Sequence, residues 1–195
     1  MSSTPANAFA LFDLPIDLWP DLEKLKALYL KKNSEIHPDL FQDPQEKART
    51  TEQLAELNRA YRLLQDVRTR LHHCIELTTG TPSQGVQSVP AHSIDLFMKA
   101  GSLIQQLNAF FKSWENSSVI EKAGLMEEQL GLIDSLQEIQ QELSIKTQQI
   151  EQELQLLRGN PLEPLIPQLK EHEALLSYIQ RMNQQLSEYQ NRFEI

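Results

Sequence analysis

Residues Ile36-His37-Pro38-Asp39, followed shortly by Asp43-Pro44-Gln45-Glu46, mark the point where one predicted helix ends and the next begins. Proline disfavours the α conformation in the residue before it, so the first helix should end at or before His37. Asp43 is a good N-cap residue, Pro44 suits the first helical position, and Glu46 stands where a capping box needs it. The stretch therefore predicts a helical hairpin whose connection carries His37-Pro38-Asp39.

Helical patterns also fill the residues on either side of this connection. The helix before it is predicted from about Asp17 or Asp21 to Ile36, and the helix after it from Pro44 to about Gln65. A further short helix should run from Val67 to Thr79, with Gly80 in a C-cap position. A short apolar segment, Phe9 to Phe12, precedes all three.

The second half of the chain has a different organisation. Two glycines and two prolines in Gly80–Gly85 and Pro90 indicate a linker. Beyond it, apolar residues at alternating steps of three and four predict three longer helices packed nearly antiparallel. Because no sustained alternation of β-branched residues occurs, the predicted fold class is all-α. We assign 1–80 to an N-terminal domain, 81–92 to a linker and 93–195 to a C-terminal three-helix bundle.

The amino-acid composition excludes several classes of function. The formal net charge is −9, which argues against a nucleic-acid partner because such a protein needs a basic surface to neutralise phosphates. Cys74 is the only cysteine, so no intrachain disulfide or cysteine-rich zinc module is expected. The first residues lack the basic and apolar regions of a secretory signal, and no apolar run approaches the ~20 residues that span a bilayer. We therefore expect a soluble cytoplasmic protein with no membrane partner.

The motif at the hairpin resembles that of the J-domain family, and the HscB-type iron–sulfur co-chaperones in particular. The resemblance rests on His37-Pro38-Asp39, on Asn58, Ala60, Tyr61 and Leu64 downstream, and on the opening segment Ala8–Pro15. Arg70 and the run Cys74-Ile75-x-Leu77-x-x-Gly80 are similar to the family's next helix. The resemblance implies an N-terminal J-domain, with a loop that docks on a DnaK- or HscA-type chaperone and accelerates ATP hydrolysis there. The chain itself would have no active site and no cofactor.

Residue chemistry agrees with a docking role for the loop. Pro38 fixes its own φ, so the loop is stiff and Asp39 offers a carboxylate that suits a bidentate pair with an arginine. A lysine cluster on the preceding helix would steer the encounter with an acidic chaperone surface. The predicted chaperone-binding residues are His37, Pro38, Asp39, Lys24, Lys31 and Lys32, with Lys26 in the same cluster.

The C-terminal domain is predicted to bind a client, with oligomerisation as its other implied role. In the family, an apolar pair and several glutamates on the first bundle helix contact an IscU-like iron–sulfur scaffold protein. Phe97 and Met98 match the apolar pair, and Tyr178 matches an aromatic position on the last helix. The positions that follow the pair depart from the pattern, because they carry Lys99, Gly101, Ser102 and Gln105. Ile36 and Leu40, which flank the motif, also differ from the residues usual there.

Three other interpretations remain open. The chain could be a J-domain protein that serves a different client, as the missing glutamates suggest. It could be a structural coiled-coil adaptor in which the His-Pro-Asp loop is incidental. An enzyme is disfavoured because no nucleophile–base pair, phosphate loop or metal-ligand spacing occurs. The adjacent His72, His73 and Cys74 point in different directions on a helix, so we expect core and surface positions there and no metal site.

Overall fold

The computed structural model describes residues 7–81 and 93–193, and these form helices and connecting turns without strands. The all-α prediction is confirmed. The chain divides into two compact units, one of Met1–Gln84 with Glu153–Leu169 and the other of Gly85–Gln152 with Lys170–Ile195. No helix within the described ranges is long and apolar enough to cross a membrane.

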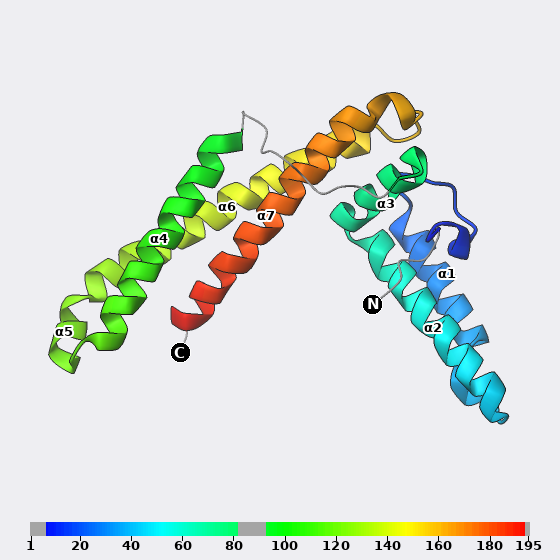
Figure 1. The fold of residues 1–195 in the computed structure, drawn as a ribbon, viewed down its shortest axis with the longest axis horizontal. Helices are drawn as coiled ribbons and strands as arrows, with labels where there is room; N and C mark the ends of the chain where they lie inside the picture. Colours follow the sequence, from blue (N-terminus) through cyan, green and yellow to red (C-terminus); the bar gives the residue numbers. More distant parts are fainter. Residues whose placement is uncertain (1–6, 82–92, 194–195) are drawn as a thin grey trace. The chain divides into compact units, whose positions relative to one another are not determined.

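The N-terminal helices begin and end where their capping residues predict. The single-turn helix η1 (Ala10–Phe12) precedes α1 (Leu22–Glu35), α2 (Pro44–Gln65) and α3 (Val67–Thr79), with the turn η2 (Pro38–Leu40) between α1 and α2. Side chains of Asp21, Asp43 and Asp66 accept backbone N–H bonds at the starts of α1, α2 and α3. Gly80 ends α3 with a φ of 66°, in the left-handed region that favours glycine. Figure 1 shows α1 and α2 side by side as a hairpin.

A buried arginine organises the core of this unit. Arg70 on α3 is 1% exposed and donates hydrogen bonds to the carbonyl of Leu18 at 2.9 Å and to that of Leu64 at 2.6 Å. Its guanidinium also lies 5.4 Å from the ring centre of Trp19. These contacts give the buried guanidinium the hydrogen bonds that a charged group needs when it is removed from water. The apolar side chains packed in this unit are Phe9, Phe12, Leu25, Leu57, Leu64, Leu71 and Ile75.

Three long helices make up the C-terminal half, as predicted. They are α4 (Ile94–Asn116), α6 (Met126–Leu156) and α7 (Ile166–Phe193), which Figure 1 draws alongside one another. Most predicted seam residues form the core, with Leu107, Phe111, Leu132, Leu136, Ile139, Leu143, Leu175, Ile179 and Leu186 buried. The seam predicted for α4 is wrong in part: Ile94 and Met98, which the spacing includes, are 42% and 68% exposed, whereas Leu103 and Phe110 are buried in their place. Near the end of α7, Arg192 lies over the ring of Phe111 at 3.8 Å and pairs with Glu115 at 2.7 Å.

The two connections of the bundle compare differently with the expectation: the turn predicted at Gly159-Asn160-Pro161 lies between α6 and α7, whereas the connection after α4 differs. The sequence predicts a turn over Trp114–Ser118, but Trp114–Asn116 form the last turn of α4, and a short helix α5 (Val119–Gly124) follows before α6. The other connection, after α6, contains η4 (Glu163–Leu165). The predicted linker 81–92 lies outside the described residues except for Thr81.

Candidate functional site

The His-Pro-Asp connection forms an ordered turn. Pro38–Leu40 is a single 3-10 turn closed by a hydrogen bond from the Leu40 N–H to the His37 carbonyl at 3.0 Å. The Asp39 N–H donates to Nδ1 of His37 at 3.3 Å, so the neutral imidazole carries its proton on Nε2. The Asp39 carboxylate is 78% exposed. Local bonds and the fixed φ of Pro38 therefore hold the backbone while the carboxylate stays free to meet a partner.

His37 has a second possible contact in the same turn. Its Nδ1 lies 3.5 Å from Oδ2 of Asp39, which becomes an ion pair only when the imidazole is protonated. That state would remove the acceptor for the Asp39 N–H, so the two contacts at Nδ1 exclude each other.

Aromatic and polar contacts hold α1 and α2, the two helices joined by the turn, against each other. Tyr29 of α1 stacks on Tyr61 of α2 with ring centres 4.1 Å apart, and its hydroxyl donates to Oδ1 of Asn58 at 2.7 Å. The remaining members of the downstream pattern, Ala60 and Leu64, are fully buried. The Asn-x-Ala-Tyr-x-x-Leu pattern thus serves to fix α2 against α1, which sets the direction in which the turn projects.

The lysines of α1 are not equivalent. Lys24, Lys26 and Lys31 are exposed. Lys32 is half-buried and its Nζ lies 3.0 Å from Oδ2 of Asp13, at the end of η1. Lys24 and Lys31 are therefore available to a partner, whereas Lys32 is already engaged within the unit. This pairing could not be seen in the sequence, because Asp13 lies 19 residues earlier.

The predicted client residues lie in two environments. Phe97 on α4 contacts Tyr178 on α7, with ring centres 5.5 Å apart and planes tilted by 43°, and both are half-buried. Arg181 lies 5.4 Å from the centre of the Tyr178 ring. Met98 instead is 68% exposed. Of the adjacent pair, Phe97 faces α7 while Met98 projects into solvent.

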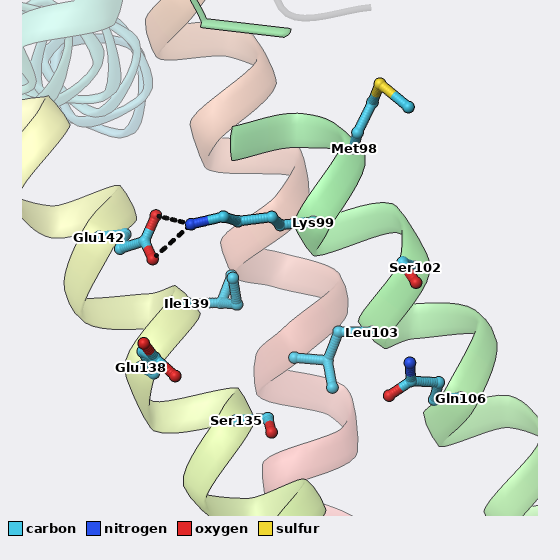
Figure 2. Close-up of a pocket in the computed structure, with 9 residues that line it drawn as sticks. All are labelled: Met98, Lys99, Ser102, Leu103, Gln106, Ser135, Glu138, Ile139 and Glu142. Carbon is cyan, nitrogen blue, oxygen red and sulfur yellow. Dashed lines mark hydrogen bonds and ion pairs between the residues drawn. The ribbon is translucent and has the colours of Figure 1, made fainter. Parts of the chain in front are cut away.

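Met98 also borders a groove between α4 and α6, shown in Figure 2. The groove has a volume of about 440 Å³, and Lys99 reaches across it to Glu142, with 3.1 Å between Nζ and Oε1. Leu103 and Ile139 provide apolar lining, whereas the rest is largely polar: Ser102, Gln106, Ser135 and Glu138. Two positions where the sequence departs from the family pattern, Lys99 and Ser102, therefore lie in this groove.

The His72-His73-Cys74 run has a structural role. Nε2 of His73 accepts the Ala8 N–H at 3.0 Å, and burial lowers the pKa of His73 below its usual value. Burial raises the pKa of Cys74 to about 12, and its thiol donates to the Asp17 carbonyl at 3.8 Å. Such a thiol is a poor nucleophile and metal ligand. In the part of the chain that the structure describes, no three His, Cys, Asp or Glu side chains gather as a metal site would need.

Comparison with known proteins identifies the relatives of the chain. No family model matches it. A co-chaperone protein HscB homolog from Mannheimia succiniciproducens is 27% identical over 185 residues, covering 94% of this chain and 99% of the relative. The corresponding protein of Haemophilus ducreyi is 26% identical with the same coverage of both chains. The chain is a homologue of the HscB co-chaperones.

Further matches support the HscB relationship locally and in the fold. An HscB homolog from Pasteurella multocida is 37% identical over 76 residues, which is 44% of that protein. The chaperone HscB from Vibrio cholerae has a similar structure, with a TM-score of 0.64 and 17% identity over 95% of this chain and 98% of that one. Human co-chaperone HscB gives a TM-score of 0.66 at 16% identity, covering 95% of this chain and 83% of that one. The fold is that of HscB, with a J-domain and a C-terminal helical bundle.

Proposed function

We propose that this HscB homologue is a J-domain co-chaperone that stimulates the ATPase of a DnaK- or HscA-type chaperone through its His-Pro-Asp turn. The observation that carries the proposal is the Asp39 carboxylate, which is 78% exposed on a turn fixed by Pro38 and by the His37 hydrogen bond. A partner that binds this carboxylate meets a group with little freedom left to lose.

The role of the chain in ATP hydrolysis is binding. Asp39 is suited to accept a bidentate, charge-assisted pair from an arginine of the chaperone. Lys24 and Lys31 add an exposed positive surface on α1 that speeds encounter with an acidic partner. The reacting groups and the nucleotide belong to the chaperone, so we assign no enzymatic activity and no cofactor to this chain.

The C-terminal bundle is proposed to deliver the client, an IscU-like iron–sulfur scaffold protein, for cluster assembly. Homology to HscB supports this client, and Phe97, Met98 and Tyr178 are the proposed contacts. The exposed Met98 and the Phe97–Tyr178 ring pair fit an apolar contact with an aromatic anchor. We place this function in the cytoplasm, with neither nucleic acid nor membrane as a partner.

A different client is the second candidate. Its motivation is the groove beside Met98, where Lys99 is paired with Glu142. Lys99 and Ser102 both stand there at positions that depart from the acidic and leucine pattern of the family. A client whose basic surface complements the glutamates of the family would meet a less acidic surface on α4 of this chain, which favours a client with a different charge pattern.

Two measurements on the purified full chain test the proposal. The first is the steady-state ATPase rate of a DnaK-type chaperone with and without the chain, which should rise on addition. The second is a titration with the iron–sulfur scaffold protein from the same source. Stimulation without scaffold binding would keep the co-chaperone role and favour the different client, whereas no stimulation would refute the central proposal.

A further inference from the structure

The short helix α5 and the start of α6 expose four large apolar side chains. Val119 and Ile120 on α5 are each 86% exposed, and Met126 and Leu130 at the start of α6 are 58% and 61% exposed. We call these residues the tip face. Single exposed apolar residues are ordinary on a protein surface, whereas four large ones within the twelve residues 119–130 mark a candidate interaction site.

Local contacts hold the tip face in place without burying it. Ser118 and Glu121 form a reciprocal capping box, in which Oε2 of Glu121 accepts the Ser118 N–H at 2.7 Å. Lys122 lies 5.4 Å from the centre of the Trp114 ring, which ties α5 back to α4. A helix of six residues would not persist by intrinsic propensity alone. These contacts therefore stabilise a short helix whose first two residues are directed into solvent.

On α6, the exposed apolar residues form a stripe of their own. Met126 and Leu130 are four residues apart, so they lie on one face of the helix. The buried seam of the same helix begins at Leu132 and continues at Leu136. The stripe is thus additional to the core positions, and the bundle does not need it to fill its interior.

The charges around the tip face are mainly negative. Glu127, Glu128 and Asp134 are exposed, and no ion-pair partner for them exists among residues 7–81 and 93–193. Hydrogen bonds from Ser118 lower the pKa of Glu121, so this carboxylate is also ionised at neutral pH. Lys122 is the one basic residue between 119 and 134.

We propose that the tip face docks a protein segment that combines apolar side chains with lysine or arginine. The apolar residues would supply the contact area, and the surrounding carboxylates would select positive charge. A second copy of this chain would place the same acidic residues opposite one another, and like charges across an interface are unfavourable. The tip face includes neither the His-Pro-Asp turn nor Phe97, Met98 and Tyr178, so this docking role is separate from ATPase stimulation and from binding of the scaffold client.

The test uses the full chain and a labelled helical peptide of about 18 residues, long enough to form a helix on binding, with leucine on one face and lysine on the other. Fluorescence anisotropy should detect binding to the parent protein. The double substitution Ile120→Ser with Leu130→Ser should weaken it about tenfold or more, as loss of central apolar contacts does. Glu127→Gln with Glu128→Gln should weaken binding and flatten its dependence on salt.

The matched control is Leu156→Ser at the opposite end of α6, where a leucine is 82% exposed. This substitution removes similar apolar area and should leave the affinity unchanged, with circular dichroism confirming that all variants are folded. Equal affinity of the Ile120/Leu130 variant and the parent would overturn the proposal. So would equally tight binding of a peptide with glutamate in place of lysine, or sedimentation of the parent as a dimer that the tip substitutions dissociate.

Discussion

His73 links the first described residues of the chain to α3. Its Nε2 accepts the Ala8 N–H, and its ring stacks on Phe9 with centres 6.0 Å apart. An acceptor nitrogen cannot carry a proton, so the contact requires the neutral imidazole. Burial lowers the pKa of His73; Glu76 opposes this shift and His72 adds to it.

The first prediction concerns stability in mild acid. The unfolded chain binds a proton at His73 near pH 6.5, whereas the folded chain binds it only at lower pH. Between the pKa of His73 in the folded chain and its pKa in the unfolded chain, the unfolded state holds more protons. The contribution of His73 to the free energy of unfolding is therefore complete above the unfolded pKa and is lost as pH falls through the folded pKa. One proton limits the loss to about 1.4 kcal/mol per pH unit. Urea unfolding of the parent and of His73→Gln, each at about pH 7.5 and about pH 5.5, measures this loss of stability. Glutamine is the suitable replacement because it can accept the hydrogen bond from the Ala8 N–H and does not titrate. An equal pH dependence in both proteins would contradict it.

The second prediction separates the lysines of α1. Lys24→Glu with Lys31→Glu should slow association with the chaperone several-fold at low salt and change dissociation little, because exposed charges act on encounter. Lys112→Glu with Lys170→Glu is the control, since it makes the same change in net charge on exposed residues of the bundle. Stopped-flow association rates compare the two. Equal slowing by both pairs would mean that only net charge matters.

Residue-level predictions succeed where the cause is local. Asp21, Asp43 and Gly80 cap the helices as their chemistry requires within a few residues of sequence. The ion pair of Lys32 with Asp13 and the His73–Ala8 bond join residues 19 and 65 positions apart. Neither pair carries a local signal, so the sequence leaves both open.

Among the helices, α4 carries two of the three residues proposed to contact the client, Phe97 and Met98. Met98→Ala should reduce affinity for the iron–sulfur scaffold protein with little change in melting, because the side chain is 68% exposed. Phe97→Ala should reduce affinity and also lower stability, by no more than about 3 kcal/mol, since its half-buried ring packs on Tyr178. Thermal unfolding and calorimetric titration measure the two effects.

The control for this third prediction is Leu156→Ala. Leu156 is 82% exposed at the end of α6, outside both the proposed client surface and the tip face, so scaffold affinity should not change. If Met98→Ala binds the scaffold as tightly as the parent does, the client surface does not include Met98.

The spacing of apolar residues predicts the long helices of the bundle but not the short one. Steps of three and four located α4, α6 and α7, because each buries a long apolar seam. The helix α5 is too short to show a period, and its apolar residues Val119 and Ile120 face solvent, so the apolar pattern does not predict it. Its one sequence signal is Ser118 followed three residues later by Glu121, the capping box that the structure contains.

At the scale of the whole molecule, each of the two compact units is built from two segments that are not consecutive in the sequence. Glu153–Leu169, which connects α6 to α7, groups with the N-terminal unit, where Arg158 lies 3.5 Å from Asp17. The spacing of apolar residues could predict both helices but not this grouping, which depends on contacts between segments far apart in the sequence. An ion pair of this exposed kind contributes only about 0–1 kcal/mol.

The fourth prediction follows from that small contribution. Residues 1–80 alone should unfold cooperatively and retain some stimulation of the chaperone, because Arg70 and the buried apolar side chains of α1, α2 and α3 lie within the fragment. Circular dichroism with urea, together with the ATPase assay, tests it. An unfolded fragment would mean that 153–169 is an essential part of the N-terminal core and that the division into domains 1–80 and 93–195 is wrong.

The most direct test of the account is the chaperone ATPase rate with Asp39→Asn. Asparagine keeps the shape of the side chain but loses the charged acceptor, whose hydrogen bond contributes about 1.5–3 kcal/mol. Asp95→Asn on α4 makes the same chemical change at another exposed aspartate and serves as control. We expect stimulation by the parent and Asp95→Asn proteins and none by a folded Asp39→Asn protein; full stimulation by the folded Asp39→Asn protein would contradict the account.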